Sequence, residues 1–319
     1  MKILVTGGAG FLGVRLIKAF LARADGGRAD VRVVAADTLP CPIHDSRVES
    51  RIGTVTDQAF ITHIVDRDVD VVCHLAAVLS GQSESEFDTG MRVNVEGTRN
   101  LLEACRALRT APRFVFTSTI AVFGGGLPDV IPGDLAVTPQ SSYGTAKAIG
   151  ELLVSDYSRR GFIDGVACRV PTVAIRPGAP NSALSSFASG IIREPLNGLV
   201  SICPVPLDTR IWISSPDTAT ANLLHAATFP TAGLEGRRML NLPGLSVTPA
   251  AMLDSLERLA GATARSLVGC EPDPATMRIV CGWPGAFEVS RPLRLGFLGD
   301  ESIDAVVRQF MAERALDPH

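Results

Sequence analysis

Residues 2–13 read KILVTGGAGFLG, and this stretch decides the fold class. A short apolar run, Ile3–Thr6, is followed by three glycines with G-x-x-G-x-x-G spacing and then by an apolar-periodic helix. In a strand–turn–helix the glycines permit a tight turn, let a pyrophosphate approach bare backbone at the helix N-terminus, and let helix and strand pack closely. The position after the first strand favours this interpretation over a plain βα turn. The predicted cofactor contacts are Gly7, Gly10, Phe11, Leu12 and Gly13.

The acid that closes the second strand-like run is Asp37. It lies where a carboxylate accepts hydrogen bonds from an adenosine ribose. Thr38, Leu39 and Pro40 follow it, so no neighbouring arginine is available for a 2′-phosphate. The segment therefore favours NAD over NADP, and the alternative is a solvated acid at a strand end.

The first half of the chain alternates β-branched runs with helical patterns, which predicts βαβ units and a parallel sheet. We expect an α/β fold, a Rossmann doubly wound parallel sheet with a smaller C-terminal substrate-binding cap. Residues 1–170 form the NAD-binding domain in this interpretation, and about 208–230 rejoin it. Residues 171–207 and 231–319 form the substrate-binding region. The predicted strands are Ile3–Thr6, Arg32–Ala36, Val69–Leu75, Phe114–Ser118 and Val166–Val170, and Ile211–Ile213 is expected to return to the same sheet.

Predicted helices include one that contains Tyr143 and Lys147 in a Y-x-x-x-K motif. Residues four apart lie on one helix face. An ammonium beside a phenol favours the phenolate and lowers its pKa from near ~10, and a cationic nicotinamide would lower it further. Tyr143 is therefore the predicted general base. The alternative is a surface helix that carries the motif by chance.

A hydroxyl for orienting the substrate comes from the strand Phe114–Ser118, which Thr119 follows. Open α/β sheets present ligand-binding groups at the C-terminal ends of their strands. Thr119 is the first candidate and Ser118 the competitor, while a hydroxyl that caps its own turn is the alternative.

Composition excludes several functional classes. The chain has 319 residues, 46% of them hydrophobic, and a net charge of −3 without a long basic run, so neither nucleic acid nor an anionic membrane is an expected partner. No apolar stretch reaches roughly 18 residues and no targeting segment is evident. The seven cysteines lack metal-ligand spacing, which predicts reduced thiols, no bound metal and a cytoplasmic enzyme.

Together these motifs resemble the extended short-chain dehydrogenase/reductases, the NAD-dependent epimerase/dehydratase family, over nearly the whole chain. Further matching segments are HLAA at 74–77, NVEGT at 94–98 and RVP at 169–171. The resemblance implies that Lys147 also binds the nicotinamide ribose and that Asn94 holds a helix kink and a water beside Lys147. It further implies cofactor contacts from Leu75, Ala76, Pro171 and Thr172. Two departures are Phe123, where the family has tyrosine, and Thr54, where an acid usually lies near the adenine.

Thr119 is followed by Ile120 and Ala121, so the acid that family dehydratases use is missing. Residues 78–80 and 176–183 resemble the branch that oxidises D-erythronate, with threonine and uronate dehydrogenases as related branches. The resemblance implies oxidation of this small sugar acid at C2 to 2-dehydro-D-erythronate. A buried carboxylate needs an arginine or several donors. Candidate substrate contacts are Ser80, Arg176, Ser185, Ser186 and Arg210, beside Thr119 and Tyr143.

Other functions stay open at this point. A sugar-nucleotide epimerase would keep NAD bound and release no NADH, and a non-catalytic NAD-sensing protein would not need both Tyr143 and Lys147. The resemblance also implies a homodimer formed through helices at 94–108 and 143–160. The alternative is that these helix faces pack on their own sheet.

Overall fold

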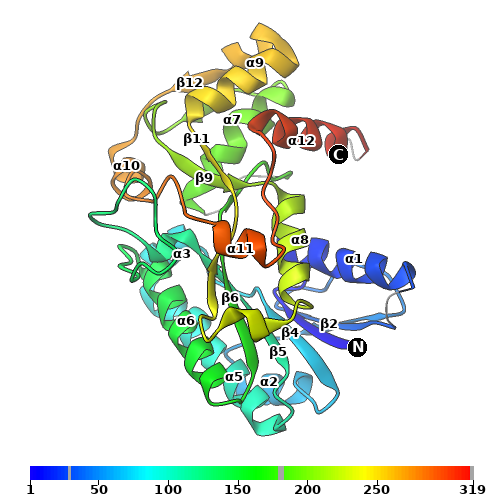
Figure 1. The fold of residues 1–319 in the computed structure, drawn as a ribbon. Helices are drawn as coiled ribbons and strands as arrows, with labels where there is room; N and C mark the ends of the chain where they lie inside the picture. The colour runs from blue at the N-terminus through cyan, green and yellow to red at the C-terminus, as the bar shows by residue number, and fades with distance from the viewer. Residues whose placement is uncertain (28–29, 179–182, 317–319) are drawn as a thin grey trace. The chain divides into compact units, whose positions relative to one another are not determined.

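The computed structural model describes residues 1–27, 30–178 and 183–316 (Figure 1). Of the segment 176–183, whose pattern guided the substrate prediction, residues 179–182 lie outside the described chain. The chain divides into two compact units. The first comprises residues 1–119, 142–169 and 220–240, and the second comprises residues 120–141, 170–219 and 241–319.

The first unit contains a seven-stranded sheet with the order β10-β6-β5-β4-β1-β2-β3. Strand β1 pairs in parallel with β2 on one side and β4 on the other, with Ile3 opposite Val33 and Val71. From β1 the strand order proceeds to β2 and β3 on one side and to β4, β5 and β6 on the other. This reversal of the strand order at β1 confirms the predicted doubly wound Rossmann sheet. The strands are β1 (Lys2–Thr6), β2 (Arg32–Asp37), β3 (Val48–Ile52), β4 (Val69–His74), β5 (Arg113–Thr119), β6 (Asp164–Val170) and β10 (Met239–Asn241).

Helices cover both faces of this sheet (Figure 1). Leu4, Val72 and Phe114 lie in one core cluster with residues of α2, α5 and α6. Successive strand residues point to opposite faces, so the other face receives Ile3 and Val71, and α1 packs there against β1 and β2. The helical elements are α1 (Phe11–Asp25), α2 (Gln58–Ile64), α3 (Ser80–Ser85), α4 (Phe87–Met91), the π-helix η1 (Arg92–Glu96), α5 (Gly97–Leu108), α6 (Ser142–Arg159) and the 3-10 helix η4 (Thr231–Leu234).

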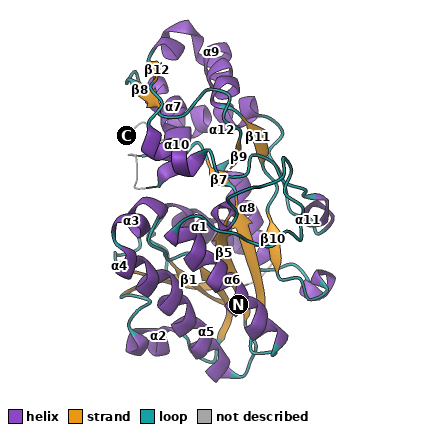
Figure 2. Cartoon of the chain, turned by 90° about the vertical axis from the view of Figure 1, so that its left-hand side faces the viewer, coloured by secondary structure: helices purple, strands orange, loops and turns teal. Residues whose placement is uncertain are grey.

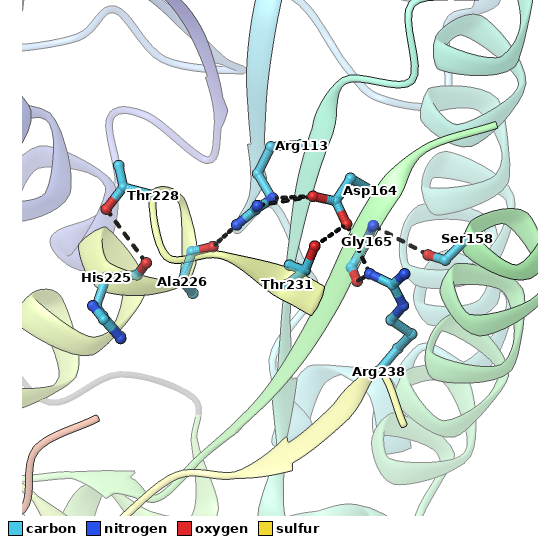
Figure 3. Close-up of polar contacts among 9 residues, drawn as sticks. All are labelled: Arg113, Ser158, Asp164, Gly165, His225, Ala226, Thr228, Thr231 and Arg238. Atoms are coloured by element: carbon cyan, nitrogen blue, oxygen red, sulfur yellow. Dashed lines mark hydrogen bonds and ion pairs between the residues drawn. The ribbon is translucent and has the colours of Figure 1, made fainter. Parts of the chain in front are cut away.

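A cluster of ion pairs joins the N-terminal ends of β5 and β6 to the segment that leads into β10 (Figure 3). The Asp164 carboxylate accepts hydrogen bonds from Arg113 at 2.8 and 3.0 Å, from Arg238 at 2.7 Å and from Thr231 at 2.6 Å. Arg113 also donates to the carbonyl oxygen of Ala226 at 2.8 Å. The cluster therefore ties the start of two central strands to the last part of the unit.

The second unit has its own core, built around α7, α9 and α12 and a three-stranded sheet with the order β11-β9-β7 (Figure 2). A further pair of parallel strands, β12 and β8, lies against α7 and α9. The elements are η2 (Ile120–Val122), β7 (Thr172–Val173), η3 (Leu184–Ser186), α7 (Phe187–Leu196), β8 (Ser201–Cys203), β9 (Ile211–Ser214), β11 (Leu245–Val247), α9 (Pro249–Ser266), β12 (Val268–Cys270), α10 (Pro274–Val280), α11 (Ser290–Arg294) and α12 (Ile303–Leu316). Helix α8 (Pro216–Ala226) runs from the second unit into the first.

The prediction that Ile211–Ile213 returns to the main sheet is wrong. These residues form β9, which pairs in parallel with β7 and antiparallel with β11. Ile211 and Ile213 are buried in the core of the second unit. A short apolar run fits either sheet, and local periodicity does not specify its partner. Strand β10 takes the place beside β6 instead.

Candidate functional site

The glycine turn combines an unusual backbone angle with close packing. Gly7 has φ +73°, which disfavours other residues, and a Cβ there would lie 2.7 Å from the nitrogen of Ala76. A Cβ on Gly13 would lie 2.0 Å from the carbonyl oxygen of Gly7. Gly10 is the N-cap of α1, so no side chain covers this helix N-terminus at the cap. The turn thus has the bare backbone and the helix N-terminus that a pyrophosphate requires.

Asp37 ends β2 beside this turn. One oxygen of its carboxylate accepts a hydrogen bond from the Ala9 backbone at 3.0 Å, and the other accepts from the Leu39 backbone at 3.3 Å. The carboxylate is therefore anchored between the glycine turn and the segment after β2. Thr54, which replaces the family acid, exchanges a hydrogen bond with Thr56 at 3.0 Å.

The residues after β4 lie against the glycine turn. The Leu75 backbone donates to the Thr6 carbonyl oxygen at 3.0 Å, continuing the pairing of β4 with β1. His74 is 1% exposed and links Thr6 Oγ1, at 2.7 Å, to Thr98 Oγ1, at 2.9 Å. Burial and then the charge of Lys147 lower the pKa of His74 to about 3, so the ring is neutral. The sequence motifs HLAA and NVEGT contain His74 and Thr98, but they do not by themselves indicate this chain of hydrogen bonds.

Asn94 lies in η1, where a π-helical turn interrupts the run from α4 to α5. Its amide is 2% exposed and pairs with both backbone groups of Val78: Oδ1 accepts from the nitrogen at 2.8 Å, and Nδ2 donates to the oxygen at 3.0 Å. Single π turns are common at functional sites. Asn94 therefore holds the segment after β4, and its predicted water beside Lys147 stays a prediction.

Tyr143 and Lys147 lie in the first turns of α6, which packs against β5. Lys147 is 2% exposed, and its Nζ donates to the Thr117 carbonyl oxygen at 2.8 Å. The same Nζ lies 4.8 Å from the ring centroid of Phe116 and 5.8 Å from that of Tyr143. The lysine thus joins the helix to the end of β5 and places its charge beside the phenol.

Burial opposes ionisation of both groups. It raises the pKa of Tyr143 to about 12 and lowers the pKa of Lys147 to about 8, the latter against an opposing effect of Glu151. The lowering of the Tyr143 pKa that we predict from Lys147 must therefore overcome this desolvation of the phenolate.

Ser118 and Thr119 end β5 differently. Ser118 is 2% exposed, and its Oγ donates to Glu151 Oε1 at 2.5 Å, so its hydroxyl is directed at α6. Successive strand residues alternate in direction, so Thr119 does not share this orientation. The hydroxyl of Ser118 is thus already committed to Glu151, and contact of Thr119 with the substrate stays a prediction.

The start of α6 has a partner far away in the sequence. The Ser142 backbone donates to Glu84 Oε1 at 2.6 Å, immediately before Tyr143. Glu84 belongs to α3, which packs against α6 and begins at the buried Ser80. A carboxylate at a helix N-terminus is favourable, but nothing in the local sequence pairs residues so far apart.

The remaining candidates belong to the second unit. Pro171 is buried and Thr172 begins β7. The half-buried Arg176 lies near Arg193, which donates to the Arg176 carbonyl oxygen at 2.9 Å and forms an ion pair with Glu194. Burial and then the charge of Arg193 lower the pKa of Arg176. By contrast, Arg210 is exposed and its Nη2 donates a 3.4 Å hydrogen bond to Ser246 Oγ. Ser185 and Ser186, both partly buried, lie in η3.

Within the described ranges, no cluster of three or more His, Cys, Asp and Glu side chains is arranged to hold a metal ion. In the same ranges, none of the helices combines the length and apolar character needed to cross a membrane.

Known proteins resemble this chain over nearly its whole length. A D-erythronate dehydrogenase from Cupriavidus necator is 48% identical over 99% of both chains, and one from Haemophilus influenzae is 41% identical over 98% of this chain and 99% of its own. A solved nucleoside-diphosphate-sugar epimerase from Agrobacterium tumefaciens superimposes with a TM-score of 0.94, at 39% identity over 99% of this chain and 94% of its own. Residues 3–240 match the model of the NAD dependent epimerase/dehydratase family. The chain therefore belongs to the NAD dependent epimerase/dehydratase family.

Proposed function

We propose that this protein is an NAD-dependent dehydrogenase that oxidises D-erythronate at C2 to 2-dehydro-D-erythronate. The observation that carries the reaction type is the buried Lys147, hydrogen-bonded to the end of β5 one helical turn after Tyr143. The observation that supports the substrate is the resemblance over nearly the full length to two D-erythronate dehydrogenases.

NAD fits the first unit by its chemistry. The glycine turn offers bare backbone at a helix N-terminus for the pyrophosphate, and Asp37 offers a carboxylate for the adenosine ribose. Lys147 would hold the nicotinamide ribose. Further proposed contacts come from Phe11, Leu12, Leu75, Ala76, Pro171 and Thr172. When bound, oxidised NAD supplies the acceptor for the hydride that leaves C2.

Side chains of the protein bind the substrate hydroxyl and accept its proton. Thr119 donates a hydrogen bond to the reacting hydroxyl and orients it, and Tyr143 takes the hydroxyl proton as the C2–H bond breaks. Lys147 keeps positive charge beside the phenol, which favours the phenolate. The net reaction converts one hydroxy acid and NAD into one keto acid, NADH and a proton.

Arg176 is the favoured anchor for the substrate carboxylate. A half-buried guanidinium whose neighbour Arg193 is also cationic gains most from an added anion, because each cation raises the cost of the other. Arg210 is exposed, so water competes with any carboxylate there. Ser80, Ser185 and Ser186 are the proposed hydrogen-bond donors to the rest of the substrate.

A comparison of substrates and variants tests this assignment. D-Erythronate should be oxidised far more efficiently than erythritol, because loss of the carboxylate leaves buried donors unpaired. Arg176→Ala should lower kcat/KM for D-erythronate about a hundredfold and reduce the preference over erythritol. Arg210→Ala is the matched control and should change kcat/KM little. Equal turnover of erythritol by the wild type would contradict the carboxylate anchor.

Sugar-nucleotide epimerisation is the second candidate, favoured by the solved epimerase with 39% identity. It predicts conversion of a nucleotide sugar without net release of NADH. Against it stand the two full-length dehydrogenase relatives. We further propose that the protein is a homodimer and that it lies in the cytoplasm. The seven free cysteines support a reducing compartment. Sedimentation of the purified protein would test the dimer.

A further inference from the structure

A buried carboxylate without an assigned role lies behind the proposed catalytic residues. Glu151 of α6 is 2% exposed, and Arg169 of β6 is 4% exposed. Arg169 donates from Nε to Glu151 Oε1 at 2.8 Å and from Nη2 to Oε2 at 2.7 Å. Such a bidentate pair fixes both side chains strongly, but burying it costs desolvation energy that apolar packing would avoid. Its retention calls for a role beyond packing.

The pair is joined to the end of β5. Glu151 Oε1 also accepts the 2.5 Å hydrogen bond from Ser118 Oγ. The residue before Ser118 is Thr117, whose carbonyl oxygen accepts from Lys147, and the residue after it is Thr119. Glu151 therefore holds the middle residue of a segment whose two flanking residues serve the proposed reaction.

The same carboxylate lies on the Lys147 face of α6. Glu151 follows Lys147 by four residues, so the two side chains share one helix face. The helix approaches β5 closely, because a Cβ on Gly150 would lie 2.4 Å from the ring of Phe116. Burial lowers the pKa of Lys147, and the charge of Glu151 counteracts it.

We propose that Glu151 and Arg169 form a positioning pair for the reaction: through Ser118 the pair fixes the end of β5, and through the carboxylate it maintains the charge of Lys147. This inference rests on the proposed dehydrogenase function and adds two positioning residues to it. Neither residue contacts the substrate or cofactor in this account.

The charges around Lys147 determine in which direction the pH profile of kcat/KM should shift when Glu151 is replaced. Glu151→Gln keeps an oxygen for Ser118 but leaves the Arg169 cation without its carboxylate. The extra positive charge promotes ionisation of Tyr143, which moves the acid limb of the pH profile to lower pH. It also promotes proton loss from Lys147, which moves the alkaline limb to lower pH. His74 adds no charge, because its ring is neutral. Among the described residues, the other charged groups on elements packed against α6 are partly or fully exposed: Glu84, Asp88, Arg92, Glu96, Arg99, Arg106, Arg113, and Glu103, which accepts from Tyr157.

Three variants separate positioning from simple stability. In Glu151→Gln both limbs of the pH profile of kcat/KM should shift down by on the order of one pH unit. Glu151→Gln/Arg169→Gln removes both charges and should bring the limbs back close to those of the wild type. Asp164→Asn breaks a separate ion-pair cluster of the same unit, at the opposite end of β5, and should lower thermal stability without moving either limb.

A readout without turnover distinguishes failure of this inference from failure of the proposed function. The pH dependence of NADH binding, followed by fluorescence, reports the Lys147 charge whatever the substrate is. Its alkaline limb should shift down in Glu151→Gln and recover in the double variant. Unchanged limbs in a folded Glu151→Gln protein, or an equal shift in Asp164→Asn, would overturn the proposal.

Ser118→Ala provides a second line of evidence if Glu151→Gln does not fold. The methyl group fits the same space but cannot reach Glu151, so the end of β5 loses its anchor. We expect kcat to fall about tenfold with KM for NAD nearly unchanged. Ser118→Thr, which retains the hydroxyl, should recover part of the loss. Full kcat in Ser118→Ala would contradict the positioning role of the pair.

Discussion

At the scale of single residues, the proposed reaction depends most on Tyr143. Tyr143→Phe removes the phenol and should lower kcat at least about a hundredfold, because a general base contributes 10²–10⁴-fold. NADH binding should change little, whereas Lys147→Ala should weaken both turnover and NADH binding. Steady-state kinetics and fluorescence titration check both expectations. A Tyr143→Phe protein with more than about a tenth of the wild-type kcat would exclude Tyr143 as the base.

Turnover should fall at alkaline pH because the reaction needs Lys147 in its charged form. Its pKa is lowered to about 8 by burial, so the ammonium loses its proton as the pH rises through that value. Turnover should then decline above about pH 8, while loss of the Tyr143 proton promotes turnover from the acid side. The profile of kcat against pH at saturating NAD tests this. A kcat that rises steadily to pH 10 would contradict the role of the Lys147 charge, since about 10.4 is the pKa of a solvated lysine.

Cofactor choice is also a single-residue property. Asp37→Asn keeps the shape of the side chain but removes the charge that repels a 2′-phosphate. The ratio of kcat/KM for NADP to that for NAD should therefore rise by about tenfold or more. Asp37→Ala should weaken NAD use further, because it also loses the 3.0 Å hydrogen bond to the Ala9 backbone. An unchanged ratio in both variants would show that Asp37 does not read the ribose.

At the scale of elements, Glu84 of α3 controls the start of α6. Glu84→Ala removes the acceptor for the Ser142 backbone and should destabilise the protein by about 1 kcal/mol, with a fall in kcat because Tyr143 follows at once. Glu86→Ala is the matched control, since the Glu86 carboxylate accepts a hydrogen bond from the side chain of Gln82, at 3.2 Å, and none from the start of α6 in the described part of the chain. Thermal unfolding and kcat should be unchanged there. Equal effects of the two substitutions would refute a specific cap.

The sequence predicted most central strands, but it did not predict which residues from different elements contact one another. The strands at Ile3, Arg32, Val69, Phe114 and Val166 were predictable because buried parallel strands are continuous apolar runs. Strand β3 (Val48–Ile52) was not, because VESRI is largely polar and partly exposed at the sheet edge. The same limit applies to the site: Glu151, Ser118 and Arg169 come from three elements, and no local pattern joins them.

At the scale of the whole molecule, stability depends on pH through the Asp164 cluster. Burial raises the pKa of Asp164, but hydrogen bonds from Thr231 and Arg238 and the charge of Arg113 outweigh it, so the pKa is lowered overall. A lowered carboxyl pKa stabilises the fold above the unfolded value of about 3.9 and ceases to do so as the pH falls through the folded value.

Asp164→Asn should therefore reduce the free energy of unfolding by about 2 kcal/mol near neutral pH, an amount limited by partial solvent contact. The difference from the wild type should shrink as the pH falls below about 4. Chemical denaturation at a series of pH values measures it. A difference that grows toward acid pH would reverse the sign of the argument.

The activity proposed for the whole protein is the oxidation of a sugar acid by NAD. The most direct measurement is the stoichiometry of purified protein incubated with D-erythronate and NAD, with NADH followed by absorbance and the product by mass spectrometry. The account predicts one NADH for each 2-dehydro-D-erythronate formed, and none of either from Tyr143→Phe. Absence of NADH from D-erythronate, together with epimerisation of a nucleotide sugar without NADH release, would contradict it.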